Sequence, residues 1–311
     1  MKSIIILLSI PLFFLCGCRK SSTTAPSQEQ KNTPLASFPL PQVPEIIVSP
    51  DERDTYLLLH YWNCFDFKDT TLLHKAEICE QGVVDYLALV GSFPDSVVIQ
   101  ESIQTFCSQF TSHSESQKVI PSLIEKYLYN PNSPLRNDPL WILFLDNMLH
   151  QDSIQNLGGA SKWRFLKKMM LQNLPGSKAN DFTYYNTQGK KNSLYRTSGE
   201  YTVLFFYDPA CPNCHQVMLE MRSHAAFTKE IENGRITVLA ICDNEDEEAW
   251  RNSVNTQPEI WKCVTDRGVI EEKALYDLKA SPTLYLLDRT KKVLLKDCTF
   301  KEMYTYLGLI G

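Results

Sequence analysis

Residues 201–214 read YTVLFFYDPACPNC, an apolar run that leads directly into two cysteines separated by two residues. The apolar part predicts a buried strand, and Pro212 suits the first turn of a helix because a backbone N–H has no partner there. Cys211 is therefore expected at a helix N-terminus, where unpaired N–H groups and the helix dipole favour a thiolate. In such settings the pKa of a cysteine falls from about 8.5 to roughly 3.5–7.5. The pattern predicts that Cys211 and Cys214 can exchange disulfides.

The first residues of the chain have the pattern of an export signal. A short basic start precedes an apolar stretch over 4–15, which is too short to span a bilayer. This stretch ends in Leu15-Cys16-Gly17-Cys18, which resembles a bacterial lipobox. The resemblance implies a lipoprotein signal peptide over 1–17 and lipidation of Cys18. We therefore expect a protein that is anchored to a membrane rather than spanning it, with an ordinary cleaved secretory signal as the alternative.

Charge and cysteine content narrow the class of protein further. The chain has 311 residues, a formal net charge of -5 and no basic run, so we expect no nucleic-acid partner. An exported protein lies where disulfides persist, yet only Cys211 and Cys214 have a spacing that carries chemistry. We expect the other cysteines beyond the signal to be small buried hydrophobes: Cys64, Cys79, Cys107, Cys242, Cys263 and Cys298. The sequence leaves structural disulfides among them open.

The hydropathy pattern divides the rest of the chain into a tether and two domains. Residues 18–44 are polar and rich in Ser, Thr, Gln and Pro, which predicts a flexible tether. Residues 45–174 carry apolar side chains at helical spacing and predict a small all-α helical domain. Residues 175–311 alternate short apolar strands with helices, which predicts an α/β domain with a mixed sheet covered on both faces.

Individual elements follow from the same periodicities. In the first domain the predicted helices cover 56–65, 77–90, 97–110, 116–129, 141–149 and 163–174. In the second domain the predicted strands cover 181–185, 193–195, 202–207, 235–242, 283–287 and 292–296, and the predicted helices cover 211–232, 244–254 and 301–309, with a short helix before Tyr276. The first two strands flank a hairpin turn at Gln188-Gly189-Lys190, and the last two form a terminal hairpin.

Residues from about 179 to 311 look like a thioredoxin-fold domain of the membrane-tethered, extracytoplasmic thiol–disulfide reductase type. The motifs that carry this resemblance are Ala179–Thr183 with Gly189-Lys190, the strand into Cys211–Cys214, the strand leading to Asp243, Glu247–Trp250 and Ser281-Pro282-Thr283. The resemblance covers a little under half of the chain. It implies that the thiolate of Cys211 attacks a target disulfide and that Cys214 then resolves the mixed disulfide.

The same resemblance implies where a substrate lies. Pro282 matches the family's cis-proline, which lies against the sulfurs and pairs its neighbouring backbone with an extended substrate segment. Ser281, Pro212 and Asn213 are the further residues that the resemblance places beside the substrate. A trans turn is the alternative for the Ser281–Pro282 bond taken alone.

One position departs from the family's pattern. Cytosolic thioredoxins carry a buried acid on the strand six residues before the first cysteine, and this chain has Phe205 there. The sequence therefore assigns no carboxylate as the proton acceptor for Cys214. Asp208 lies between strand and motif, and the sequence is equally consistent with a place near the sulfurs and with a solvated loop.

Other readings of the motif remain open. Cys211–His215 also satisfies C-x-x-C-H, the attachment pattern of a c-type haem, with Met218 or Met221 available as a second axial ligand. Haem attachment, however, needs neither the preceding strand nor the distant Ser-Pro-Thr. A single CxxC supplies only two ligands, so we expect no metal.

Two further alternatives concern enzymes without this exchange chemistry and proteins without catalysis. A thiol peroxidase would have proline and Thr or Ser where this chain has Leu204 and Asp208, so that pattern fails. A thioredoxin-fold adaptor would bind partners without turnover, but it would not need both thiols.

The helical domain resembles a module without a known role that precedes thioredoxin-like domains in lipoproteins of gut Bacteroidota. The stretches that carry this resemblance are 60–67, HYWNCFDF, and 137–141, NDPLW. His60, Trp62 and Asp66 could be read as a site, but a packed helix with one polar cap is the preferred interpretation. The aromatic-rich helices could instead form a docking surface for client proteins or for the α/β domain.

Together these patterns predict a lipid-anchored thiol–disulfide oxidoreductase of the cell envelope that acts as a reductant and needs no cofactor. We expect its partners to be exported proteins with disulfides or cysteines and an upstream electron donor that the sequence does not identify. Arg19-Lys20 after the anchor lacks the acidic residues that resemble a surface-export signal in Bacteroidota. This favours a position facing the periplasm.

Overall fold

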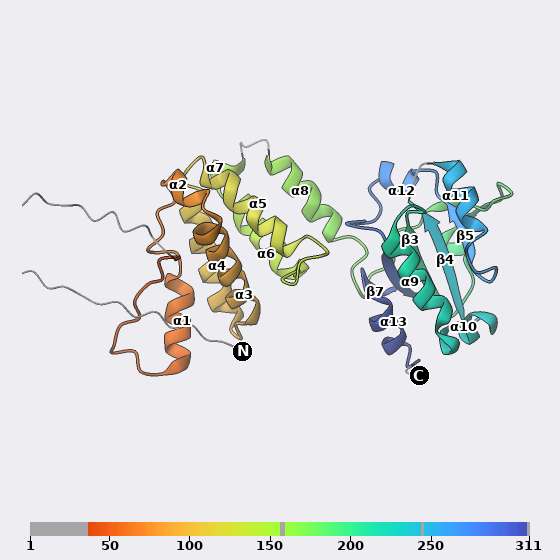
Figure 1. Ribbon diagram of the computed structural model, residues 1–311, viewed down its shortest axis with the longest axis horizontal. Coiled ribbons are helices and arrows are strands. Elements are labelled where there is room, and N and C mark those ends of the chain that lie inside the picture. Colours follow the sequence, from red (N-terminus) through yellow and green to blue (C-terminus); the bar gives the residue numbers. More distant parts are fainter. Residues whose placement is uncertain (1–36, 156–158, 244–245, 310–311) are drawn as a thin grey trace, which may run out of the picture. The chain divides into compact units, whose positions relative to one another are not determined.

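The computed structural model describes residues 37–155, 159–243 and 246–309 (Figure 1). The predicted signal peptide, including Cys16 and Cys18, and most of the predicted tether lie outside these residues. Within the described ranges, every helix is too short or too polar to cross a bilayer.

The N-terminal part of the structure is helical, as predicted. Its elements are α1 (Pro50–His60), α2 (Thr70–Leu73), the π-helical turn η1 (Ala76–Glu80), α3 (Gln81–Ser92), α4 (Ser96–Phe110), α5 (Ser116–Leu128), α6 (Asp138–Leu149), α7 (Asp152–Gln155) and α8 (Gly159–Met170). We call α1–α8 the helical domain. Each predicted helix has a counterpart, but α1 begins six residues before the predicted start at Tyr56, and the short helices α2 and α7 were not predicted.

Capping residues explain where several of these helices begin. The Asp95 side chain accepts hydrogen bonds from the backbone N–H groups of Val97 and Val98, which starts α4. The Asn137 side chain accepts from the N–H of Leu140, and Pro139 occupies the first turn of α6. Such side chains satisfy N–H groups that have no partner inside the helix.

Stacked aromatic rings form the centre of the helical domain. Trp62 stacks on Phe106 of α4 with ring centroids 4.3 Å apart, and it meets Tyr86 of α3 edge-on. Phe38, inside the segment predicted as a tether, stacks on Tyr61 at 4.9 Å and packs against Trp62. The chain is therefore attached to the helical core from Phe38 onward.

The C-terminal part is the predicted α/β domain. Its elements are β1 (Thr183–Tyr185), β2 (Lys191–Ser193), the 3-10 turn η2 (Leu194–Arg196), β3 (Tyr201–Tyr207), α9 (Pro212–Ser223), α10 (Ala225–Glu232), β4 (Ile236–Cys242), α11 (Glu247–Val254), β5 (Lys262–Thr265), α12 (Val269–Glu272), β6 (Thr283–Asp288), β7 (Val293–Lys296) and α13 (Phe300–Tyr306). Within the described residues the strands form one mixed sheet in the order β2-β1-β5-β4-β3-β6-β7. β3 runs parallel to β4 and antiparallel to β6, so it lies inside the sheet.

Alternate side chains of β3 point to opposite faces of the sheet, as the period of a strand requires. Val203, Phe205 and Tyr207 pack into a core with residues of α9, α10, α11 and α13. Leu204 and Phe206 pack into a second core with α12 and with the segment that contains β1. Both faces of the sheet are covered, as predicted, although much of the second face is covered by segments outside helices.

Two features of this domain differ from the prediction. The helix predicted over 211–232 is broken at His224, whose backbone is extended and whose ring accepts a hydrogen bond from the N–H of Phe227. The sequence analysis also missed β5, a strand of four residues between α11 and α12. The predicted hairpins at β1–β2 and β6–β7 are confirmed.

The two outer strands of the sheet are short or covered. β2, at one end, has three residues. β7, at the other end, pairs with β6 through a register shift at Leu286/Leu287. On its outer side β7 exchanges hydrogen bonds with the chain just before β1: Gly176 N–H donates to the Val293 carbonyl and Val293 N–H donates to the Ser177 carbonyl, both at 2.8 Å.

Residues 37–311 pack as one compact unit, and a buried lysine joins the helical and α/β domains. The Lys279 side chain is 2 % exposed, and its ammonium forms an ion pair with Asp138 of α6. It lies 3.5 Å from Asp277 and over the ring of Tyr129, 4.7 Å from the centroid. Since Lys279 precedes Ser281 by two residues, the helical domain contacts the loop that leads to Pro282.

Candidate active site

Cys211 occupies the N-terminal end of α9, as predicted. It is the N-cap residue, and its sulfur accepts the backbone N–H of Cys214 at 3.4 Å. Its own N–H donates to the Asp208 carbonyl at 3.1 Å, which closes the turn between β3 and α9. Pro212 is the first residue of the helix, and both Pro212 and Asn213 are exposed. The half-buried sulfur of Cys211 is therefore available for attack from outside.

Cys214 has different surroundings from Cys211, although it is three residues away. Its side chain is 1 % exposed and belongs to the core between α9 and the sheet. Burial raises the pKa of the Cys214 thiol far above its ordinary value, and the nearby Cys211 sulfur and Asp243 carboxylate raise it further. Cys214 is thus held protonated, in the state expected of a resolving thiol before the first exchange.

The loop before β6 faces the sulfur of Cys211. The Ser281–Pro282 peptide bond is cis, which confirms the predicted geometry. The Cys211 thiol donates to the Ser281 carbonyl at 3.2 Å, so this loop lies directly against the sulfur. The structure therefore brings together Cys211, Cys214, Ser281 and Pro282, which come from distant parts of the chain.

Asp243 is the residue of this site that the sequence analysis failed to single out. It follows β4, and its N–H donates to the Tyr207 carbonyl at 3.0 Å, which places it beside the end of β3. Its carboxylate accepts a hydrogen bond from the Ser281 hydroxyl. Burial, followed by the nearby Asp208 carboxylate, raises the pKa of Asp243. The sequence predicts both strands but not their pairing, so it does not show that Asp243 lies beside the end of β3.

Phe205 confirms the departure noted in the sequence. The ring is fully buried, stacks on Tyr207 at 5.6 Å and meets Trp261 edge-on. No ionisable group occupies this position of β3. The Asp243 carboxylate, which acts electrostatically on Cys214, approaches from β4 instead.

The haem reading of C-x-x-C-H does not fit the surroundings of the motif. His215 is exposed on α9, whereas Met218 and Met221 are buried in the core on the sheet side of the same helix. The two types of side chain therefore do not face a common site. Within the described residues, no three His, Cys, Asp or Glu side chains are grouped so that they could hold a metal ion.

Five of the remaining cysteines form no disulfide within the described residues: Cys64, Cys79, Cys107, Cys263 and Cys298. Cys79, Cys107 and Cys242 are buried, as predicted for small hydrophobes. Cys263 and Cys298 are half-buried, and Cys64 is exposed, contrary to the expectation.

His60, Trp62 and Asp66 do not form a site. Trp62 is buried among aromatic rings, and the His60 ring hydrogen-bonds the Asn63 amide at 2.9 Å. Asp66 accepts the backbone N–H of Lys68 at 2.9 Å and so stabilises a turn. This confirms the preferred interpretation of a packed helix with polar residues at its end.

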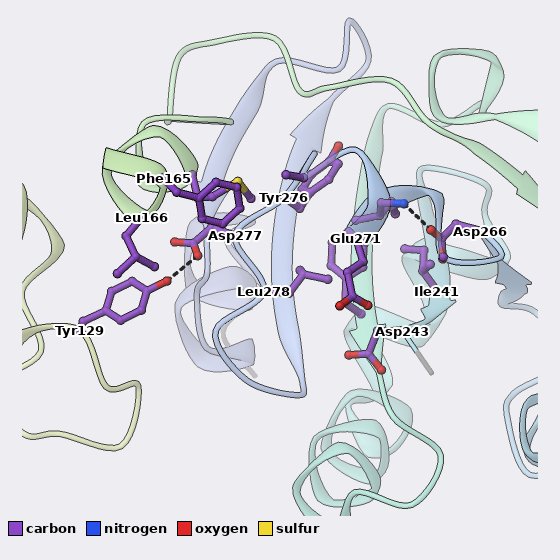
Figure 2. A pocket seen from close by; sticks show the side chains of 15 residues that line it. Tyr129, Phe165, Leu166, Ile241, Asp243, Asp266, Glu271, Tyr276, Asp277 and Leu278 are labelled. Atoms are coloured by element: carbon purple, nitrogen blue, oxygen red, sulfur yellow. Dashed lines mark hydrogen bonds between the residues drawn. The ribbon is translucent and has the colours of Figure 1, made fainter. Parts of the chain in front are cut away.

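A cavity of about 530 Å³ lies beside the loop that contains Ser281 (Figure 2). The helical domain supplies one wall, with Tyr129, Phe165, Leu166 and Met169. The α/β domain supplies the other, with side chains that include Asp243, Asp266, Ile270, Glu271, Asp277 and Leu278. The sequence could not predict this cavity because it depends on how the helical domain and the α/β domain meet.

The chain matches two described families over adjacent ranges. Residues 16–173 match a domain of unknown function, DUF5106, and residues 175–295 match the AhpC/TSA family. A crystal structure described as a thioredoxin-like protein from Bacteroides caccae is 34% identical, over 88% of this chain and 99% of that chain, with a TM-score of 0.72. These matches confirm a thioredoxin-like α/β domain that follows an all-α domain.

Other solved structures match less than half of this chain. A conserved protein of unknown function from Bacteroides fragilis is 39% identical over 43% of this chain and 98% of that chain, with a TM-score of 0.42. A domain described as a possible thiol-disulfide isomerase from Cytophaga hutchinsonii is 28% identical over 44% of this chain and 93% of that chain, with a TM-score of 0.40. None of the curated proteins matches this sequence.

Proposed function

The chain carries a DUF5106 domain and belongs to the thioredoxin-like proteins, and we propose on this basis that it is a thiol–disulfide oxidoreductase that reduces disulfides of exported proteins. The observation that carries the proposal is the pairing of a half-buried Cys211 sulfur at a helix N-terminus with a buried Cys214 three residues later. This asymmetry suits one thiol for attack and the other for resolution.

The reaction needs two exchanges and transfers two electrons. The Cys211 thiolate attacks one sulfur of the client disulfide, which forms a mixed disulfide and releases the other client sulfur as a thiolate that takes up a proton. Cys214 then loses its proton and attacks the Cys211 sulfur, which releases the second client thiol. The client is reduced, Cys211 and Cys214 are oxidised to a disulfide, and a dithiol donor must reduce them again.

Asp243 is the proposed proton acceptor for Cys214. Its carboxylate acts on the Cys214 thiol electrostatically and is held by the Ser281 hydroxyl. A carboxylate whose pKa is raised by burial is a better base than an ordinary one. The substitution Asp243→Asn should therefore slow the second exchange, so that the mixed disulfide accumulates during turnover in comparison with an exposed control, Glu259→Gln.

Reduction of insulin disulfides by the fragment from residue 37 onward tests the activity. Cys211→Ser should abolish turnover, and Cys214→Ser should trap the client as a mixed disulfide visible on a non-reducing gel. Turnover by Cys211→Ser equal to the unsubstituted protein would exclude the proposed nucleophile.

The direction of electron flow rests on the resemblance to tethered reductases. Equilibration of the pair with dithiothreitol or glutathione buffers gives its potential. A value near about -270 mV supports a reductase, and a value near about -120 mV contradicts it.

The lipid anchor at Cys18 and a periplasm-facing position are part of the same proposal. Metabolic labelling with a fatty acid should mark the full chain and not a Cys18→Ala variant. Fractionation should place the labelled protein with the membranes of the cell envelope. Label on the Cys18→Ala variant would contradict the anchor.

A further inference from the structure

We propose that the cavity beside Ser281 binds a positively charged side chain of the client polypeptide, an arginine or a lysine close to the cysteine under attack. This inference rests on the proposed function and names the class of client that it favours. Neither sulfur lines the cavity, and Asp243 is its one lining residue to which the proposed reaction gives a role.

The position of the cavity connects it to the reacting sulfur. Ser281 touches both sites: its carbonyl accepts the Cys211 thiol at 3.2 Å, and its hydroxyl donates to Asp243, which lines the cavity. Asp277 and Leu278, in the same loop, line the cavity as well. A client segment that lies along this loop has side chains within reach of the cavity when its sulfur meets Cys211.

The helical domain contributes an apolar and aromatic surface to the cavity. Phe165 of α8 is 52% exposed, an unusual exposure for so large an apolar ring, and Leu166 lies next to it on the same wall. Ile270 and Leu278 line the cavity from the α/β domain. The methylene groups of a long basic side chain can pack on such surfaces, and a cation is attracted to the face of an aromatic ring.

The charges of the lining have one sign. Four carboxylates line the cavity, from Asp243, Asp266, Glu271 and Asp277, and no lysine or arginine does. Figure 2 shows Asp266, Glu271 and Asp243 on the wall supplied by the α/β domain and Tyr129, Phe165 and Leu166 opposite. Like charges gathered at a partly closed surface favour the entry of a cation.

Two of these carboxylates already have strong partners. Asp277 accepts the Tyr129 hydroxyl at 2.8 Å and lies 3.5 Å from the Lys279 ammonium, and Asp266 accepts the Ile270 N–H at 2.6 Å. These two shape the wall. Within the described chain the Glu271 side chain makes no hydrogen bond or ion pair, and it is exposed at the cavity.

Electrostatic repulsion among the carboxylates of the cavity favours the binding of a cation. Burial raises the pKa of Asp266, and its backbone hydrogen bonds lower it. The Glu271 carboxylate adds a smaller contribution that raises it. Asp266 and Asp208 in turn contribute to raising the pKa of Asp243. A guanidinium or ammonium between Glu271 and Asp243 would relieve this repulsion.

The test compares two peptide disulfides that are identical except for one position next to the cysteine, which is arginine in one and glutamate in the other. Each rate of reduction is divided by the rate of the same protein on hydroxyethyl disulfide, a small uncharged probe of the thiols. We expect the arginine peptide to be favoured about three- to tenfold, the size of a partly exposed charge contact.

Variants at exposed positions test whether the preference for the arginine peptide arises in the cavity. Glu271→Lys should abolish or reverse it, whereas Glu272→Lys, the next residue on α12 and outside the lining, should leave it unchanged. Phe165→Ala should weaken the preference, whereas Leu171→Ala, an exposed apolar residue outside the lining, should not. The melting temperature of each variant shows that it is folded.

The outcomes separate this inference from the proposed function. Equal normalised rates for the two peptides, or the same change in Glu271→Lys and Glu272→Lys, would overturn the charge-selective cavity and leave the oxidoreductase intact. Failure of the unsubstituted protein to reduce hydroxyethyl disulfide would instead overturn the proposed function, and this inference with it.

Discussion

Two thiols on one turn of helix have unequal access to solvent. Cys211 is half-buried at the N-cap of α9, and Cys214, three residues later, points into the core. The difference arises because Cys211 is the N-cap residue at the end of α9, whereas Cys214 lies in the first turn on the side that packs against the sheet. The local sequence therefore determines which sulfur is accessible from outside and which is buried.

Limited alkylation should distinguish the two thiols. Iodoacetamide at neutral pH should modify Cys211 first and leave Cys214 unmodified, because burial shields Cys214 and raises its pKa. Peptide mapping by mass spectrometry of the reduced, native protein measures this order. Equal modification of both cysteines, or modification of Cys214 first, would contradict the assignment of their roles.

Asp243→Asn should change stability in a pH-dependent way. The folded-state pKa of Asp243 is raised, so the charged carboxylate is disfavoured by folding. Its contribution to stability is present below the unfolded pKa of about 3.9 and is lost as pH rises through the folded pKa. The Asn variant should therefore melt higher than the unsubstituted protein at pH 7, and the gap should shrink towards about pH 4.

The control for this prediction is an exposed carboxylate, Glu259→Gln, which should shift the melting temperature little at either pH. A gap between Asp243→Asn and the unsubstituted protein that is the same at both pH values would show that charge is not its cause.

At the scale of single residues, the motif predicted the thiols and the cis bond but not their acidic neighbour. Cys211, Cys214 and Pro282 have fixed spacing or a distinctive X-Pro signature. Asp243 is recognisable only after β3 and β4 are known to lie side by side in register, with Tyr207 opposite Cys242. Strand pairing is a long-range property, so a single sequence does not reveal it.

At the scale of elements, apolar periodicity predicted that a helix or strand is present better than it predicted where that element begins and ends. The predicted helix over 211–232 is two helices because the His224 ring caps the N–H of Phe227. Histidine is not among the residues by which N-caps are usually recognised, so the pattern read as continuous. The predicted start of the first helix was six residues late because the first turn of α1, from Pro50, is polar and carries no apolar signal.

Gly82 of α3 provides a test of how the Phe38 segment is attached. A Cβ added at Gly82 would overlap the Phe38 ring, which stacks on Tyr61. Gly82→Ala should therefore lower the free energy of unfolding by about 1–3 kcal/mol, the cost of overpacking. Alanine is otherwise favoured over glycine inside a helix by about 1 kcal/mol.

The sign of this effect should change when the ring is removed. In a Phe38→Ala background, Gly82→Ala should be neutral or should stabilise the protein by up to about 1 kcal/mol. Urea unfolding of the four proteins in this cycle measures the coupling. The same destabilisation by Gly82→Ala in both backgrounds would show that Phe38 is not the cause.

At the scale of the whole molecule, buried charge connects the two domains. The Lys279 ammonium lies among the carboxylates of Asp138, Asp277 and Asp297, of which Asp138 belongs to α6 and the others to the α/β domain. Additional backbone contacts come from Lys296, whose ammonium donates to the carbonyls of Met170 and Gln172 at 2.7 Å. The loop that contains Lys279 and Ser281 is thereby held in contact with the helical domain.

Lys279→Met should leave these carboxylates without their cation. Removing one partner of a buried ion pair costs about 3–5 kcal/mol, and the partial exposure of Asp138 brings the expected loss to the lower end. Unfolding of the unsubstituted protein should be a single transition. In Lys279→Met, which lacks the ion pair between the domains, the two domains should unfold in separate transitions.

Hydrogen exchange followed by mass spectrometry detects which domain opens first. The exposed Lys273→Met serves as the matched control and should keep the single transition. Joint unfolding in Lys279→Met would show that other contacts are sufficient to connect the domains.

The sequence predicted the two domains separately and the contacts between them not at all. Lys279 and Asp138 are 141 positions apart, and each alone reads as an ordinary surface charge. The cavity beside Ser281 has the same origin, because Phe165 faces it only after α8 and the α/β domain come together. Periodicity describes how one element is buried, not which elements meet.

The short or covered outer strands of the sheet limit how another polypeptide can pair with it. β2 offers only three residues, and the outer side of β7 is already bonded by the chain near Gly176. Neither border is a ready template on which a non-native polypeptide can be added strand by strand. If the proposed function holds, a client opened by reduction should therefore not seed fibril-like stacking along the borders of this sheet.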